Sequence, residues 1–120
     1  DQISTSGQLP LISGSLPMTG LVGDQISQED AAGQARVAAL NALAAAADVA
    51  GGVNNIRRVI RVVVYVASAA DFTAQPAVAN GASKLFGEIF GDAGRHIRSA
   101  IGVASLPLGA PVKVELTVQV

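Results

Sequence analysis

Residues 95–115 read RHIRSAIGVASLPLGAPVKVE, two segments rich in β-branched residues around a turn region. Two prolines and a glycine punctuate the middle, so the pattern predicts strands at 97–104 and 112–120, joined as a hairpin-like pair. Because side chains alternate across a strand, Glu115 is expected to point away from the apolar face of the second strand. Arg98 shares its face of the first strand only with alanine and glycine, which predicts a concavity beside its guanidinium group.

Composition limits the class of protein. With 120 residues, 50% hydrophobic and 14% charged, the chain is expected to form one domain over residues 1–120. A net charge of −1 gives no electrostatic reason to expect a nucleic-acid or anionic membrane partner. The absence of cysteine and the single histidine argue against a disulfide framework, a thiolate nucleophile and a Cys- or His-based metal site.

The location of the chain is inferred from what its segments can do. The alanine-rich run at 31–50 is interrupted by polar residues and falls short of a membrane span. No signal peptide is recognisable, which favours a cytoplasmic protein. The chain begins at Asp1 without a methionine, so a preceding segment or a removed targeting segment stays open as an alternative.

The first half of the chain predicts two strands and a helix. Alternation at residues 2–9 indicates a strand with one polar face, and residues 20–23 are expected to form a short edge strand. Ser27 is a suitable N-cap, so a helix should run from there to about Ala50 and stop at a pair of glycines. Its inward stripe is expected to comprise Ala32, Ala35, Ala39, Leu40, Leu43, Ala46, Ala47 and Ala50.

The middle of the chain predicts a central strand followed by a second helix. Residues 57–67 are apolar on both faces, which is typical of a strand covered on both sides. Pro76 suits the first turn of a helix that ends near Gly91. Asn80-Gly81 is a hairpin signal by itself, but no strand pattern flanks it, so it is assigned to this helix. The residues expected to be buried there are Val78 or Ala79, Ala82, Leu85, Phe86, Ile89 and Phe90.

These elements predict an α+β domain in which two helices cover one face of a mixed sheet. The strands on either side of each helix should run parallel through right-handed crossovers. The residues expected on the other face are Ser4, Ser6, Val59, Arg61, Val63, Tyr65, Arg98 and Glu115. This mixture is too apolar to be left to solvent, which favours burial against partner subunits.

Short motifs along nearly the whole chain resemble one known family. They are SGQLP at residues 6–10, Asp71-Phe72, NGAS at residues 80–83, Arg98-Ser99-Ala100 with Leu106-Pro107, and Val114-Glu115. The chain resembles the YjgF/RidA family of enamine and imine deaminases, formerly called L-PSP endoribonucleases. Segments 75–83 and 90–96 are similar to a divergent YjgF-like branch. The resemblance implies a chorismate-mutase-like fold and a homotrimer in which three sheets form a barrel with clefts between subunits.

The resemblance also implies roles for particular residues. Arg98 matches the arginine that grips the substrate carboxylate, which a guanidinium group can do with two parallel hydrogen bonds. Glu115 matches the glutamate that positions a water or relays protons. Ser6, Gly7 and Asn80 match residues that line the cleft, and Ala100 stands where the deaminase branch often has cysteine. From the resemblance, the family's first N-terminal strand, which supplies an aromatic residue to the cleft in many relatives, is expected to be missing from residues 1–120.

The implied reaction is cofactor-free hydrolysis of a 2-imino or 2-enamino acid to a 2-keto acid and ammonia. Two alternatives stay open: a trimeric protein that binds small carboxylate-bearing metabolites without turnover, and an endoribonuclease. Arg98 is also compatible with a structural ion pair, and His96 with a surface or hydrogen-bonded structural role. The arginines at 57, 58 and 61 lack aromatic neighbours in the pattern of an RNA-binding platform and are interpreted as strand-end and intersubunit charges.

Overall fold

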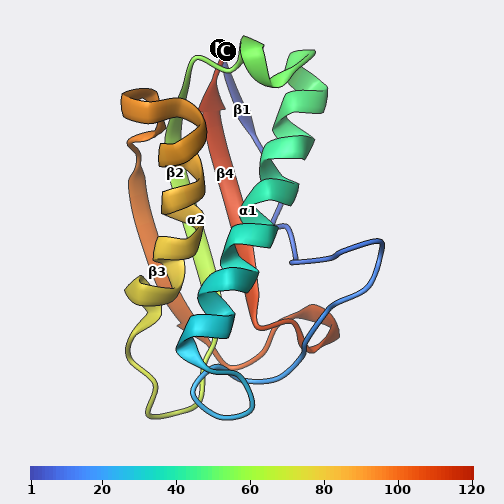
Figure 1. Cartoon of the computed structure of the whole chain (residues 1–120), viewed down its shortest axis with the longest axis vertical. Coiled ribbons are helices and arrows are strands. Elements are labelled where there is room, and N and C mark those ends of the chain that lie inside the picture. Colours follow the sequence, from blue (N-terminus) through green and yellow to red (C-terminus); the bar gives the residue numbers. More distant parts are fainter.

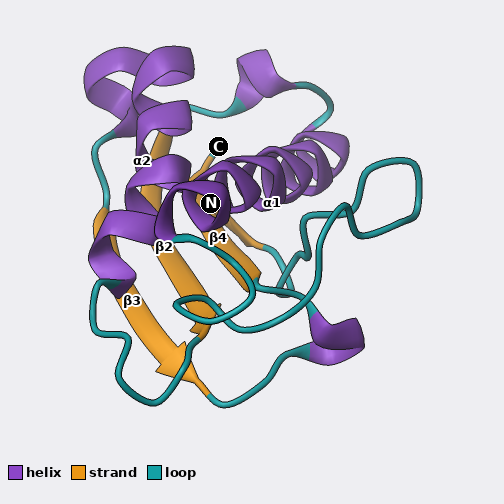
Figure 2. Ribbon diagram, turned by 60° about the horizontal axis from the view of Figure 1, so that its bottom comes forward, coloured by secondary structure: helices purple, strands orange, loops and turns teal.

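The computed structural model describes all 120 residues, which form a four-stranded sheet with two helices on one face (Figure 1). The elements in chain order are β1 (Gln2–Ser4), α1 (Gln28–Ala50), η1 (Val53–Asn55), β2 (Arg58–Ala67), α2 (Gln75–Phe90), η2 (Gly91–Gly94), β3 (Ile97–Val103), η3 (Pro107–Gly109) and β4 (Val112–Gln119). Figure 2 shows the two layers, with α1 and α2 on the same side of the strands. The predicted α+β architecture is therefore confirmed. None of the helices combines the length and the hydropathy that a membrane span requires.

The strand order is β1-β4-β2-β3, which corrects the predicted pairing of the last two strands. β2 lies between β3 and β4, parallel to the first and antiparallel to the second. Its Val64 has Ala100 on one side and Val114 on the other. The hairpin prediction was wrong because the two segments do not pair with each other: β3 occupies one hydrogen-bonding edge of β2 and β4 occupies the other. β2 and β3, which flank α2, are parallel neighbours as predicted.

The N-terminal segments form less regular strand than predicted. β1 spans only three residues, and pairing resumes at Gln8, which bridges Val114. Between them Gly7 lies against Lys113, where a Cβ would approach the Lys113 Cδ to 2.5 Å. The expected edge strand at 20–23 reduces to isolated bridges of Val22, which is bonded through its backbone to residues 67 and 69.

Helix α1 begins and ends as predicted, but its buried stripe is rotated. The Ser27 hydroxyl accepts a hydrogen bond from the Asp30 amide at 3.1 Å, and Gly51 closes the helix in the left-handed conformation. Leu40, expected inside, is 51% exposed. An alanine-rich helix has little contrast between its faces, so the pattern did not determine the stripe. The buried residues are Ala31, Gln34, Ala35, Ala38, Ala39, Ala42, Leu43 and Ala46.

Helix α2 buries most of its predicted residues and crosses close to α1. Ile89 is the exception, at 43% exposure. Asn80-Gly81 lies inside the helix, which confirms that the hairpin signal had to be rejected. A Cβ on Gly81 would lie 1.9 Å from the carbonyl oxygen of Ala32, so only glycine allows this approach. The buried residues are Val78, Ala79, Ala82, Leu85 and Phe86.

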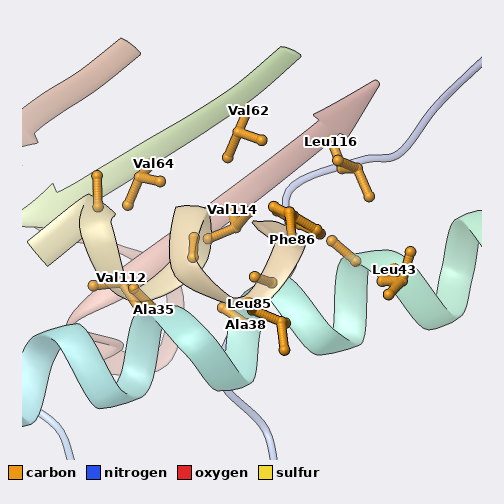
Figure 3. Close-up of a cluster of buried hydrophobic side chains, with 14 of the residues drawn as sticks. Ala35, Ala38, Leu43, Val62, Val64, Leu85, Phe86, Val112, Val114 and Leu116 are labelled. Atoms are coloured by element: carbon orange, nitrogen blue, oxygen red, sulfur yellow. The ribbon is translucent and has the colours of Figure 1, made fainter. Parts of the chain in front are cut away.

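The core lies between the helices and the covered face of the sheet (Figure 3). The labelled cluster in that view contains Ala35, Ala38, Leu43, Val62, Val64, Leu85, Phe86, Val112, Val114 and Leu116. Val59 belongs to the same core, although alternation along β2 placed it on the other face. A β-bulge between Val59 and Arg61 shifts the register, and the alternation is broken at that point.

The second face of the sheet carries no helix. Its central residues are Val63 and Tyr65 of β2, which pair with Glu115 and Lys113 of β4. On the neighbouring edge strand Ile97 and Ile101 are 62% and 40% exposed. We call this surface the open face.

Candidate functional site

Arg98 lies on the helix side of the sheet. Its partner in the register of β2 and β3 is Val62, a core residue that is fully buried beneath the helices. The expectation that Arg98 shares the open face with Glu115 is therefore wrong. Alternation within β3 showed which residues share a face, but only the register with β2 decides which face meets the helices.

Helix α2 holds the guanidinium group of Arg98 in place. Its Nη1 donates to Asn80 Oδ1 at 2.8 Å and to Ser83 Oγ at 3.2 Å. Asn80 and Ser83 are three residues apart on α2 and therefore lie on one helix face. Both hydrogen bonds use the same nitrogen, so the Nη2 and Nε donors are left to bind an anion.

Ser83 also contacts His96, which follows η2. The Ser83 Oγ lies 2.9 Å from His96 Nε2, and the Nδ1 atom lies 2.6 Å from the carbonyl oxygen of Gly94. A carbonyl oxygen only accepts, so Nδ1 carries a proton, and in the neutral imidazole Nε2 therefore accepts from the serine hydroxyl. The buried ring of Phe86 meets the imidazole edge to face, at 6.0 Å between centroids and 83° between planes. The orientation of the imidazole is therefore held by three separate contacts.

Ser83, His96 and Arg98 line a cavity of about 550 Å³, and none of its lining residues has an acidic or a hydrophobic side chain. A Cβ at Gly87 or Gly91 would meet nothing within 4 Å, so the space beside these glycines is open. Two arginines line the cavity, and its charge therefore favours an anionic ligand. We call it the Arg98 cavity. Its lining residues are Ser83, Gly87, Gly91, Gly94, Arg95, His96 and Arg98.

Glu115 lies on the open face, with the sheet between it and Arg98. Its Oε1 accepts a hydrogen bond from the Tyr65 hydroxyl at 2.7 Å. That hydrogen bond, with smaller contributions from burial and from the Glu115 charge, raises the pKa of Tyr65 above its ordinary value. The Lys113 ammonium lies 4.8 Å from the centroid of the same ring. A second cavity of about 330 Å³ is lined by Glu115, Tyr65 and Arg61 among others.

The other predicted site residues divide between the two sides of the sheet. Ala100 is half-buried on the helix side, two residues from Arg98 along β3. Gly7 contacts Lys113 and so belongs with Glu115. The Ser6 hydroxyl accepts from the Gln8 amide at 3.2 Å. Within one chain, the structure therefore brings Asn80, Arg98 and Ala100 to one side and leaves Glu115 on the other.

Sequence reasoning did not select Ser83 and His96 as functional residues. A signal was present in their spacing, because Ser83 follows Asn80 by three positions on a helix and His96 precedes Arg98 by two near a strand. Those spacings place each residue on the same face as its predicted site neighbour. No group of three or more metal-ligating side chains comes together in the chain.

Comparisons with known proteins agree with this fold. Residues 1–120 match the family described as "YjgF/chorismate mutase-like, putative endoribonuclease". The chain is 40% identical over 119 residues to Protein TCP17 of Trypanosoma cruzi, covering 98% of this chain and 74% of that protein.

Solved structures show the same similarity at two levels. The protein Atu1372 from Agrobacterium tumefaciens, whose function is described as unknown, superimposes with a TM-score of 0.96 at 41% identity, covering 99% of this chain and 76% of that one. The YjgF gene product from E. coli gives a TM-score of 0.67 at 25% identity, covering 98% and 79%. The chain is therefore more similar in fold to the first of these proteins than to the second.

Proposed function

The chain belongs to the YjgF/chorismate mutase-like family, and on that premise we propose that it hydrolyses 2-imino or 2-enamino acids to 2-keto acids and ammonia without a cofactor. The observation that carries the proposal is how the guanidinium group of Arg98 is held. Its Nη1 is held by Asn80 and Ser83, and the rest of its guanidinium group faces a cavity without acidic residues. This arrangement suits a substrate carboxylate, which accepts two parallel hydrogen bonds from one guanidinium group.

Binding by Arg98 would orient the reacting carbon of the substrate. In a 2-imino acid the imine carbon is directly attached to the carboxylate, so holding the carboxylate also positions that carbon. The backbone of Ala100, two residues along β3, would line the same side of the site. Positioning of water and imine would supply most of the acceleration.

The proposed assembly is a homotrimer with sites between subunits. Within one chain the sheet separates Glu115 from Arg98, and Ile97 and Ile101 leave apolar surface on the open face. Packing of the open face against neighbouring copies would cover that surface. A cleft between subunits would then combine Arg98 of one copy with Glu115 of another, where the carboxylate would orient the attacking water.

A second candidate is a binding protein for small carboxylates that has no turnover. It is favoured by one observation: no carboxylate of the chain itself lines the Arg98 cavity. An endoribonuclease is the weaker alternative, because the net charge of −1 offers little attraction for a polyanion.

The test is a coupled assay in which an amino-acid oxidase generates 2-imino acids and semicarbazide traps them. Active protein consumes the imine and slows formation of the semicarbazone. Arg98→Ala should abolish this effect, whereas Arg57→Ala, at an exposed position outside the Arg98 cavity, should not. Full turnover by Arg98→Ala would refute the proposal. Binding of pyruvate at Arg98 without turnover of small, branched or aromatic imino acids would instead favour the binding protein.

A further inference from the structure

The Ser83 hydroxyl has a base on one side and a cation on the other. Its oxygen lies 2.9 Å from His96 Nε2, to which it donates when the imidazole is neutral, and it accepts from Arg98 Nη1 at 3.2 Å. A hydroxyl oxygen has two lone pairs, so one stays available for a water or substrate proton. The imidazole is oriented in turn by the Gly94 carbonyl group, which accepts from Nδ1 and leaves Nε2 as the accepting atom of the neutral ring. A hydroxyl held by an oriented base is the arrangement that supports proton transfer.

We infer that Ser83 and His96 form the proton-transfer pair for the reaction at Arg98, with Ser83 contacting the attacking water and His96 accepting the proton through Ser83. This inference rests on the proposed function and names the residues that move its protons. The pair lies on the same side of the sheet as Arg98 and shares its cavity. Glu115 of the same chain lies on the other side and makes no contact with this cluster.

The pair completes a balanced reaction on a protonated imine. The water oxygen bonds to C2 of the substrate, and the π electrons of the C=N bond move to nitrogen. A water proton passes to Ser83 Oγ while the serine proton passes to His96 Nε2, which leaves a neutral carbinolamine and an imidazolium. The proton then returns through Ser83 to the amino group, the C–N bond breaks, and ammonia departs with its electron pair. Loss of the hydroxyl proton to solvent, where it is taken up by the ammonia, gives the 2-keto acid and ammonium.

The charged groups around His96 make its role separable from that of other residues. Arg95 and Arg98 flank it in the Arg98 cavity. Arg58 of β2 and His96 both line another cavity, of about 490 Å³, which is separate from the cavity at Glu115. Helix α2 presents Ser83 and Phe86 to the ring, neither of which is charged. Asp92 lies 3.7 Å from Arg95 Nε and is almost fully exposed. No carboxylate of the same chain lines either cavity that contains His96, so Glu115 of a neighbouring copy is the carboxylate that the assay must separate from the imidazole.

The first experiment compares pH profiles in the oxidase and semicarbazide assay, with oxidase in excess at every pH. The wild type should lose kcat as pH falls, because a protonated imidazole cannot accept the serine proton. His96→Gln keeps an acceptor for the Ser83 hydroxyl but cannot take up a proton. It should lower kcat by about 100-fold, with little change in KM and without the acidic limb.

Further variants separate the pair from a structural role. Ser83→Ala should lower kcat to the same extent, and Ser83→Thr should recover part of it because the hydroxyl is kept. Added imidazole should restore part of the kcat of His96→Ala. Ser105→Ala, a loop serine outside the Arg98 cavity, is the matched control. Thermal unfolding of each variant identifies any that fails to fold.

Each outcome decides between the two proposals. If Arg98→Ala is inactive while Ser83→Ala and His96→Gln keep wild-type kcat, the pair is refuted and the proposed function stands. If the acidic limb disappears in Glu115→Gln and persists in His96→Gln, the proton acceptor is Glu115 and the inference is wrong. A wild type without turnover refutes both.

The tautomer of His96 gives a test that needs no activity. His96 is the single histidine of the chain, so its imidazole signals in a ¹H–¹⁵N NMR spectrum need no assignment. The Nδ1-protonated form is expected, with a change in the Nε2 shift when pyruvate is added or Ser83 is replaced by alanine. A neutral ring protonated at Nε2 would overturn the inference, because that nitrogen then could not accept from Ser83.

Discussion

Gly81→Ala should destabilise the protein because Gly81 is the point where α2 approaches the backbone of α1. A Cβ there would lie 1.9 Å from the Ala32 carbonyl oxygen and 2.8 Å from its carbon. The first distance is about 1.5 Å short of an ordinary van der Waals contact of 3.4 Å. The clashing atoms are backbone inside a helix, so no side-chain rotation relieves them and the two helices must separate.

The expected change in the free energy of unfolding of Gly81→Ala is the sum of two opposing contributions. Replacing glycine by alanine inside a helix gains up to ~1 kcal/mol of helix propensity. Overpacking against backbone costs ~3 kcal/mol, the upper end of the usual range, because the displacement is large. The free energy of unfolding should therefore fall by about 2 kcal/mol, which lowers Tm by about 8 °C for a chain of this length.

Gly33→Ala on α1 is the matched control. A Cβ at Gly33 meets nothing within 4 Å, so this variant should gain up to ~1 kcal/mol from helix propensity alone. Thermal and urea unfolding followed by circular dichroism measure both variants, at equal protein concentration because assembly would contribute to stability. A Gly81→Ala variant as stable as Gly33→Ala would refute the close approach of the helices. It would also remove the basis for placing Asn80 and Ser83 of α2 beside Arg98.

Three further predictions test other parts of the structure. Tyr65 is the single tyrosine, so the ultraviolet absorbance of phenolate measures the ionisation of this residue alone. The pKa of Tyr65 should lie above the ordinary ~10 and fall towards that value in Glu115→Gln. Because the folded pKa is raised, the stabilisation from this hydrogen bond is present at neutral pH and lost as pH rises through that pKa. Ser27→Ala removes the N-cap of α1 and should lower the free energy of unfolding by ~1 kcal/mol in urea titrations, and an unchanged midpoint would contradict the cap. Leu43→Ala should cost ~2–5 kcal/mol, whereas Leu40→Ala, on the same helix but 51% exposed, should stay within ~0.5 kcal/mol; equal costs would contradict the observed stripe.

The fold was largely predictable because its strongest signals are local. A serine cap, a glycine pair and a proline mark the helix boundaries, and β-branched runs mark β2, β3 and β4. The errors lie where the outcome depends on distant contacts. The order of strands depends on which strand pairs along both of its edges, and the β-bulge at Val59 depends on the pairing with β4. Which face of α1 is buried depends on the sheet and helix that it packs against, because a helix with alanine on every side has no clearly apolar face of its own.

The sequence predicted only part of the candidate site, because Arg98 is the one predicted residue that lines the Arg98 cavity. The motifs named Asn80 and Arg98, and the structure joins them through a hydrogen bond of 2.8 Å. They also named Glu115, but a motif does not reveal the face of the sheet to which its residue points. Ser83 and His96 were not selected because each fits an ordinary structural role when considered alone. Their proposed role depends on a contact between two residues that are 13 positions apart in the sequence.

In the proposed trimer, the separation of charge across the sheet would leave each chain with two incomplete sites. On the helix side, Arg98, Ser83 and His96 would supply the anion-binding group and the proton acceptor, and no carboxylate of the same chain lines their cavity. On the open face, Glu115 and Tyr65 supply a carboxylate and a phenol beside exposed apolar surface. Because Arg98 lies on β3, an edge strand, the Arg98 cavity lies at one edge of the sheet, beside the rim of the open face. A second copy packed over that rim would be positioned to add its own Glu115, so the proton acceptor and the water-orienting carboxylate would come from different copies of the same sequence. If Ser83 and His96 transfer the proton, that step would use residues of one chain alone, and the neighbouring copy would be needed only to orient the water.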